Sequence, residues 1–191
     1  NIEAYELYLK VRELRNVANY YEHNNTLRLS LLEKIINLDP HFSEAYALLS
    51  KEHSEMVHFG SDNSQKRIDM AKENIEKAFS IKPGSPDVQF AYGYYYYGCY
   101  KDYSKALKHY KYALTKEPGN SDYNAYIGFA NRRLGNENET IKYLEKAFRL
   151  DPNSFLLVNE LLGTYLFFKR YEKIDLVENY KQLYKHTPND G

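Results

Sequence analysis

The chain has 191 residues, with 26 basic and 26 acidic side chains and a formal net charge of zero. Balanced charge with scattered Lys and Arg argues against contact with nucleic acid, and no apolar run of about 18 residues is present to form a membrane span. The single cysteine, Cys99, excludes an internal disulfide and leaves the compartment open, with the cytoplasm slightly favoured.

The first segments predict two helices. Apolar spacing indicates one helix from Ile2 to about Arg15 and a second from about Thr26 to Asn37. The linking stretch NVANYYEHNN is long enough to continue the first helix before a break at Asn24 and Asn25. A chain that opens without Met and already inside an amphipathic pattern is expected to be a piece of a longer protein.

After Asp39-Pro40, Ser43 is the expected N-cap of the helix EAYALLSKEHSEMVHF. The polar loop GSDNS separates it from a partner helix over about Ser64 to Ile81. His53 and His58 are five residues apart and therefore do not share a helix face as two metal ligands would. We expect both on the helix surface and no metal site.

The sequence Ser85-Pro86-Asp87 is a helix start signal, because it combines an N-cap residue, a proline in the first turn and an acid at the positive helix end. The run FAYGYYYYGCY follows. So many aromatic side chains cannot all face one way on a helix, so some must leave the hairpin core.

The segment from Ser121 to Asn153 predicts two helices joined by a Gly-Asn turn. Small residues, Gly128 and Ala147, stand where two helices of a tight hairpin would touch, and Gly135 supplies the left-handed residue that ends the first helix. The large apolar side chains that recur at helical spacing are Tyr126, Ile127, Ile141, Leu144 and Phe148. A last, less regular unit follows, with Leu162 or Gly163 at the small-residue position and a second helix that keeps Ile174, Val177, Tyr180, Leu183 and Tyr184 inward.

Prolines reveal a repeat. Five of the six follow NLD, SIK, TKE, RLD and KHT, at positions 40, 83, 118, 152 and 188, so successive spacings are 43, 35, 34 and 36. A period near 34 built of helix, turn and helix resembles the tetratricopeptide repeat family. An irregular helical bundle, the rival interpretation, has no reason to place prolines at a fixed period.

That resemblance implies an all-α, right-handed α-solenoid of about five helix-turn-helix units in a single array. The units are expected at about 1–42, 43–84, 85–120, 121–154 and 155–191. The third unit fits if one extra residue is allowed around Cys99 to Lys101. The family's fold then turns Tyr92 and Tyr96 toward neighbouring helices.

The same resemblance places six residues on the concave inner groove, where we expect a protein or peptide partner: Phe90, Tyr94, Tyr97, Phe129, Arg132 and Arg133. Tyr and Arg often carry binding energy at interfaces, and the arginines could receive an acid. With 21 Tyr in the chain, the alternative that the stripe is only tyrosine-rich packing stays open. Residues at the positions of the family's carboxylate clamp do not match it, so a chaperone tail is not expected: Ala47, Lys51, Phe90, Tyr94, Ala125 and Phe129.

The opening carries a second resemblance. EAYELYLKVREL, NLDP and HFSEAYALLS resemble the tetratricopeptide region of bacterial adenylate cyclases and membrane-bound winged-helix transcription regulators, with Val11 and Ser50 replacing the usual Gly and Ala. This resemblance implies an alternative function, a regulatory region that senses a small ligand or forms a homodimer. No phosphate loop, nucleophile elbow or dinucleotide fingerprint occurs, so we expect no enzyme activity, no catalytic residues and no cofactor.

Overall fold

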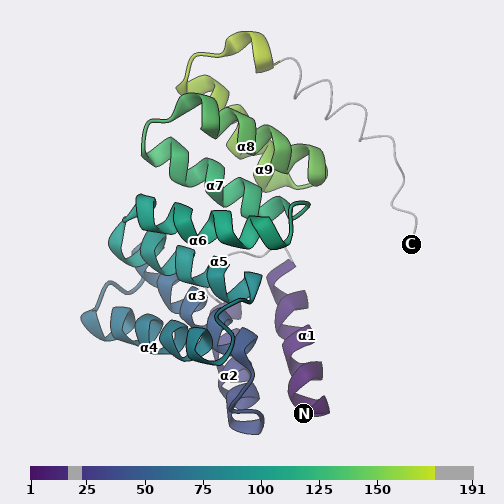
Figure 1. Cartoon of the computed structure of the whole chain (residues 1–191), viewed down its shortest axis with the longest axis vertical. Coiled ribbons are helices and arrows are strands. Elements are labelled where there is room, and N and C mark those ends of the chain that lie inside the picture. The colour runs from purple at the N-terminus through teal and green to yellow at the C-terminus, as the bar shows by residue number, and fades with distance from the viewer. Residues whose placement is uncertain (17–22, 175–191) are drawn as a thin grey trace. The chain divides into compact units, whose positions relative to one another are not determined.

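The structure is a computed structural model that describes residues 1–16 and 23–174. Over these residues every regular element is a helix, in the order labelled in Figure 1. The predicted all-α class is thus confirmed. Two compact units divide the chain, Asn1–Ala113 and Leu114–Gly191. None of the described helices is both long and apolar enough to cross a membrane.

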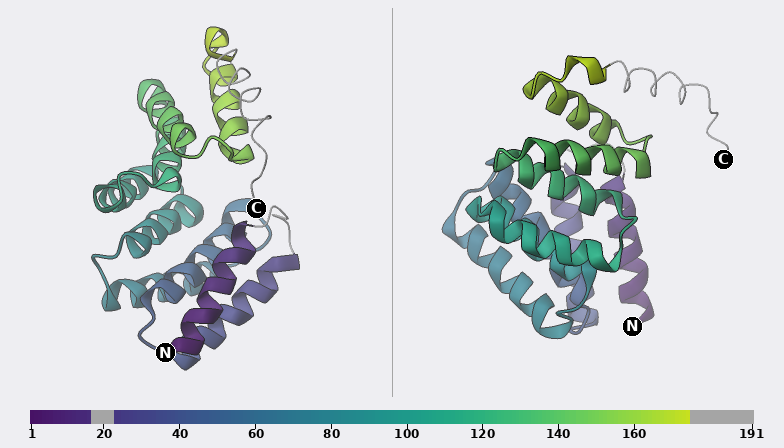
Figure 2. Two further views of the ribbon diagram at one scale, coloured as in Figure 1. Left: turned by 90° about the vertical axis from the view of Figure 1, so that its right-hand side faces the viewer. Right: turned by 45° about the horizontal axis from the view of Figure 1, so that its top comes forward.

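The first unit begins with α1 (Ile2–Asn16) and α2 (His23–Leu38), which pack together and lie side by side in the left view of Figure 2. The break expected at Asn24 and Asn25 is wrong, because α2 includes both residues. Burial of the apolar face of α2 outweighs the weak helix preference of Asn, less than about 1 kcal/mol per residue. The core contributed by these helices and the next one contains Ala4, Tyr8, Val11, Leu32, Ile35, Ala45 and Leu49.

The second hairpin consists of α3 (Ser43–Phe59) and α4 (Gln65–Ile81). Ser64 caps α4 as expected for a helix start, since its Oγ accepts a hydrogen bond from the Arg67 amide at 3.2 Å. α3 lies centrally in the first unit and packs against α2, α4 and α5 (Pro86–Tyr95).

The N-cap expected at Ser43 is wrong. Phe42 occupies the cap position of α3, and Ser43 lies in the first helical turn without a side-chain cap. Its hydroxyl instead donates to Glu44 Oε2 at 2.7 Å. A carboxylate is a stronger acceptor than a neutral group, so the neighbouring acid captures the hydroxyl.

The third hairpin joins α5 to α6 (Tyr103–Lys116) in close contact. A Cβ at Gly93 would lie 2.5 Å from Tyr110 Cε1, a distance that no real side chain tolerates. Tyr92 contacts Phe79 of α4 and His109 of α6, which confirms that its ring faces the neighbouring helices. The core between the second and third hairpins contains Ala47, Ala71, Ile75, Ala78, Val88, Ala91 and Tyr95.

A π-helical turn over Tyr96–Tyr100 accommodates the extra residue expected near Cys99 to Lys101. The Lys101 amide donates to Tyr96 O, five residues back, and Lys101 itself is left-handed with φ 56°. A π turn holds one more residue than an α turn, so the third hairpin keeps its packing despite the longer sequence.

In the second unit, α7 (Ser121–Arg133) and α8 (Glu137–Leu150) form the hairpin predicted around Gly128. A Cβ at Gly128 would lie 2.7 Å from Leu144 Cγ, so the close contact is confirmed. Gly135 has φ 76°, the left-handed conformation expected after the first helix.

α9 (Phe155–Phe167) follows and packs on α8, and a short 3-10 turn over Tyr171–Lys173 comes next. No described atom lies within 4 Å of a Cβ built on Gly163. The predicted second helix of the last unit falls on Ile174, at the end of the described residues, and on Val177, Tyr180, Leu183 and Tyr184 outside them. Whether Leu162 or Gly163 takes the small-residue position therefore stays open.

Candidate functional site

The predicted stripe of the first unit lies on α5 and its π turn. Phe90, Tyr94 and Tyr97 follow at steps of four and three residues, which place them on one side of a helix. The ring centroids of Tyr94 and Tyr97 lie 6.1 Å apart, and those of Phe90 and Tyr110 lie 5.4 Å apart. Tyr94 and Tyr97 therefore contact each other, while Phe90 packs against α6.

Lys51 of α3 faces this cluster. Its Nζ lies 5.1 Å from the Phe90 ring centroid and 5.4 Å from that of Tyr94, within the range of a cation–π contact. Glu55 Oε1 lies 3.7 Å from the same Nζ. The ammonium is thus held by two rings and a carboxylate, and Lys51 is only 8% exposed.

His58 closes the other end of the cluster. Its ring centroid lies 6.2 Å from that of Tyr94 and 5.3 Å from that of Tyr97. Lys101 Nζ lies 3.0 Å from His58 Nδ1 and donates to Gly98 O at 2.8 Å. Because a lysine ammonium can only donate, His58 Nδ1 is the acceptor in this contact.

The three rings on the predicted groove face are buried. Phe90 is 7%, Tyr94 2% and Tyr97 5% exposed. Helical spacing correctly assigned them to one face but could not show that long side chains from α3 and α6 pack onto that face. The rings are buried under other side chains and do not form an open surface on which a partner's side chains could stack.

The second unit carries the other predicted residues on α7. Arg132 donates to Glu160 Oε2 at 2.7 Å and to Thr164 Oγ1 at 3.0 Å, both on α9, and its guanidinium lies 5.5 Å from the Phe129 ring centroid. Arg132 was expected to bind an acidic group of a partner. Glu160 of the chain itself takes this place. Arg133 is exposed.

Sequence reasoning placed all six residues in one contiguous patch. Phe90, Tyr94 and Tyr97 belong to the first compact unit, whereas Phe129, Arg132 and Arg133 belong to the second. Their contiguity stays a prediction. Lys51, His58 and Lys101 were missed, although Lys51 could have been found because it occupies a groove position on α3.

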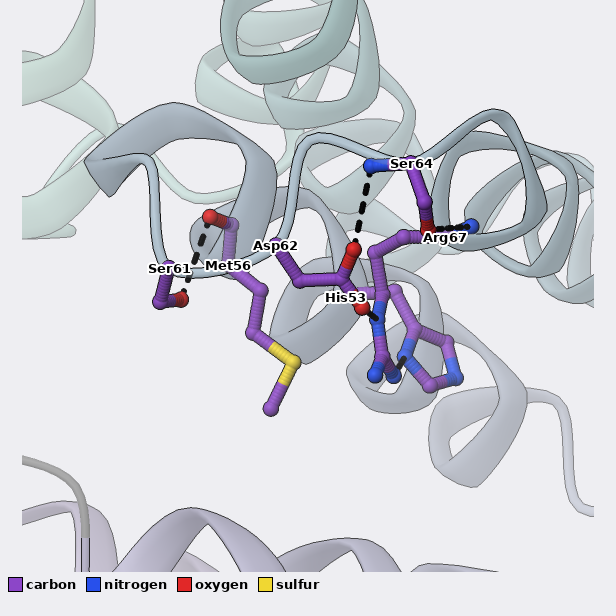
Figure 3. A network of polar contacts seen from close by, with 6 residues as sticks. All are labelled: His53, Met56, Ser61, Asp62, Ser64 and Arg67. Carbon is purple, nitrogen blue, oxygen red and sulfur yellow. Dashed lines mark hydrogen bonds and ion pairs between the residues drawn. The ribbon is translucent and has the colours of Figure 1, made fainter.

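A polar network joins α3 to the following loop and to α4 (Figure 3). His53 is 2% exposed, so its expected place on the helix surface is wrong. Arg67 Nη1 lies 2.9 Å from His53 Nδ1, and Arg67 Nε donates to Asp62 Oδ2 at 2.9 Å. Since arginine cannot accept, Nδ1 is the acceptor and the ring is neutral.

This network shifts two pKa values. Burial, followed by the charge of Arg67, lowers the pKa of His53 to about 4, against a smaller opposite effect of Asp62. Hydrogen bonds from Ser64 and then Arg67 lower the pKa of Asp62 to about 2. Both shifts follow from structural contacts between α3, its loop and α4.

The remaining candidates for chemistry are the metal-ligating residue types and the Cys99 thiol. Among the described side chains, no three His, Cys, Asp or Glu residues gather as metal ligands would. Cys99 Sγ lies 3.5 Å from Ser54 Oγ, and burial raises the pKa of the thiol. A thiol with a raised pKa is a poor nucleophile, consistent with a packing role.

Comparison with known proteins bears on the fold. No protein-family model matches the sequence, and no curated protein matches significantly. Among solved structures, PilW, a widely conserved type IV pilus biogenesis factor, matches with a TM-score of 0.72 at 17% identity over 98% of this chain and 80% of that chain. TTC0263, a thermophilic TPR protein of Thermus thermophilus, matches with a TM-score of 0.72 at 17% identity over 98% of this chain and 93% of its own.

The chain has the tetratricopeptide-repeat fold. The predicted fold class, a solenoid of helix-turn-helix units, is thereby confirmed. A third similar structure is the first TPR of Spaghetti (RPAP3) bound to the HSP90 peptide SRMEEVD, with a TM-score of 0.51 at 23% identity over 64% of this chain and 93% of that chain. The resemblance of the opening to cyclases and winged-helix regulators stays a prediction.

Proposed function

We propose that the chain is a non-catalytic interaction module that binds a peptide or protein segment on the face formed by the first helices of its hairpins. The similar TPR of RPAP3 holds a peptide, which supports this class of function. The observation that carries the proposal is the cluster on α3 and α5, where aromatic rings and cationic side chains gather on one helix face. Aromatic residues are enriched at protein interfaces.

Because the rings of this cluster are buried, a partner would rest on groups at its edge. Phe59 at the end of α3 is 62% exposed, and its centroid lies 4.8 Å from the His58 ring. An exposed aromatic side chain next to a buried aromatic cluster is a suitable anchor for a partner. In the second unit, the exposed Arg133 would contact the partner.

The alternative is a regulatory region of a multidomain adenylate cyclase or transcription regulator, which senses a ligand or forms a homodimer. The opening sequence from Glu3 to Leu14 favours it. Light scattering of the purified chain separates the two: a stable dimer supports the alternative, and a monomer that binds a heterologous protein supports the interaction module.

The test uses exposed residues, because truncating a buried ring would also unfold the hairpin. The parent chain is used to capture partners from cells of its source, the captured protein is identified, and its Kd is measured by calorimetry. Phe59→Glu and Arg133→Glu should each weaken binding by about tenfold or more. Matched controls on α8, Leu150→Glu and Arg149→Glu, also change exposed side chains and should stay within about twofold. Equal affinities of all four variants would place the partner elsewhere.

A further inference from the structure

The helix α6 has a charge pattern unlike the others. It carries four lysines and no acidic residue, whereas each other α-helix that the structure describes contains at least one Asp or Glu. The chain as a whole is neutral. A local excess of positive charge on a neutral chain either only keeps this surface solvated or marks a site where a partner binds.

Three of these lysines form a row. Lys105, Lys108 and Lys111 follow at steps of three residues, and all are exposed. Each step advances about 4.5 Å along the helix axis, so the row spans about 9 Å. Tyr112, four residues after Lys108, lies on the same side and is 39% exposed.

Asp102 is the acidic residue next to this row, and it pairs directly with only one of the three lysines. Lys105 Nζ lies 3.1 Å from Asp102 Oδ2 and 5.2 Å from the Tyr96 ring centroid. Lys108 and Lys111, in contrast, form no ion pair with any residue in the described part of the chain. Burial, and then the charge of Lys108, lower the pKa of the adjacent His109.

Stacked rings lie next to the first lysine of this row. The rings of Tyr92, Tyr96 and His109 stack on one another, with ring centroids 5.4 Å apart for Tyr92 and Tyr96 and 4.6 Å apart for Tyr92 and His109, and Lys105 lies over the Tyr96 ring. His109 Nδ1 is fixed 2.7 Å from Gln89 Oε1 of α5. Pre-ordered side chains reduce the entropy lost when a partner docks.

We propose that the face formed by Lys105, Lys108, Lys111 and Tyr112 docks an acidic segment of a protein partner. This surface is separate from the face of the proposed function, because it lies on the second helix of its hairpin. A row of about 9 Å matches the span of about four consecutive acidic residues in an extended peptide, which is about 10 Å at about 3.3 Å per residue, and Tyr112 adds an aromatic contact.

Two other anionic surfaces fit less well. Three lysines raise partitioning onto an anionic bilayer by only about two orders of magnitude, which is too little for stable attachment. Proteins that bind duplex nucleic acid commonly make about six to ten phosphate contacts, more than this row provides.

The experiment measures binding of fluorescein-labelled hexaglutamate to the full chain by anisotropy, with labelled hexaglutamine as the uncharged probe. The double variant Lys108→Glu with Lys111→Glu should weaken hexaglutamate binding by about tenfold. The control Lys66→Glu with Lys77→Glu makes the same change of net charge on exposed positions of α4 and should stay within about twofold. Lys108→Gln with Lys111→Gln repeats the test without introducing acids, and circular dichroism checks the folding of each variant.

Weaker hexaglutamate binding in the α6 variants alone supports the docking face. Equal loss in the α4 control, or no binding of hexaglutamate to the parent, would overturn it. Phosphatidylserine vesicles and a 20-nucleotide DNA are tested in parallel. Tighter, lysine-dependent binding of either would replace the acidic protein segment by a lipid surface or a nucleic acid.

Discussion

Individual side chains of α3 show how this fold buries polar groups. Glu52 is 1% exposed, yet both of its carboxylate oxygens accept hydrogen bonds from Arg28 of α2, at 3.0 and 2.8 Å. Lys51 and His53 are buried beside it with partners of their own. Breaking one such pair leaves a buried charge alone, which costs about 3–5 kcal/mol. These contacts therefore fix the position of α3 between its neighbours.

His53 makes stability depend on pH. Its pKa is about 4 in the folded chain, against an ordinary value of 6.5, so the unfolded state takes up the proton first as pH falls. The contribution of neutral His53 is complete above pH 6.5 and is lost as pH falls toward 4. Between about pH 7.5 and pH 5 the loss should be about 2 kcal/mol, measured by urea unfolding.

The control for this prediction is His53→Asn, whose amide oxygen can accept from Arg67 without titrating. Over the same pH range, the free energy of unfolding of this variant should fall by about 2 kcal/mol less than that of the parent. A parent and a variant with identical pH dependence would show that His53 does not carry the effect.

At the scale of helices, the ends are set by single residues. Gly135 ends α7 in the left-handed region with φ 76°, and Lys169 follows α9 with φ 58°. Lys169 donates its amide to Leu166 O at 3.1 Å, and the Arg170 amide bonds Tyr165 O at 2.7 Å, a closing pattern that usually contains Gly. A lysine in this conformation carries steric strain that Gly avoids.

Lys169→Gly should therefore stabilise the chain by about 0.5–1 kcal/mol, since the relief of strain exceeds the extra entropy of Gly in the unfolded state. Thermal unfolding provides the measurement. Lys146→Gly, inside α8, is the matched control and should destabilise by about 1 kcal/mol. A loss of stability in Lys169→Gly would show that the lysine side chain contributes more than its backbone costs.

The sequence predicted contacts that depend on residue size and missed those that depend on long side chains. Gly128 and Gly135 were placed correctly, because a close helix approach and a left-handed residue each require Gly. The extra residue near Cys99 was recognised, but the π turn that holds it was not, since spacing counts residues without showing how the backbone winds. Burial of Tyr94 and pairing of Arg132 depend on side chains of other helices, which periodicity along one helix does not show.

On the scale of the whole molecule, repeat folds place most contacts between neighbouring helices. Here α7 packs on α8 and α8 on α9, while α3 packs on α2, α4 and α5. The compact units divide between Ala113 and Leu114. In such folds stability is the sum of unit and neighbour terms, so a local defect need not unfold the whole chain.

Ala147→Arg tests this behaviour. Ala147 is fully buried in α8, so an arginine there overpacks the contact, at about 1–3 kcal/mol, and adds an unpaired buried charge. Hydrogen exchange should show lost protection in α7, α8 and α9, with protection in α3 and α4 retained. Asn138→Arg, at an exposed position of the same helix, should leave both sets of amides protected. If Ala147→Arg lowers protection equally in both units, the chain unfolds as one cooperative block. In that case a defect in the second unit also opens the first.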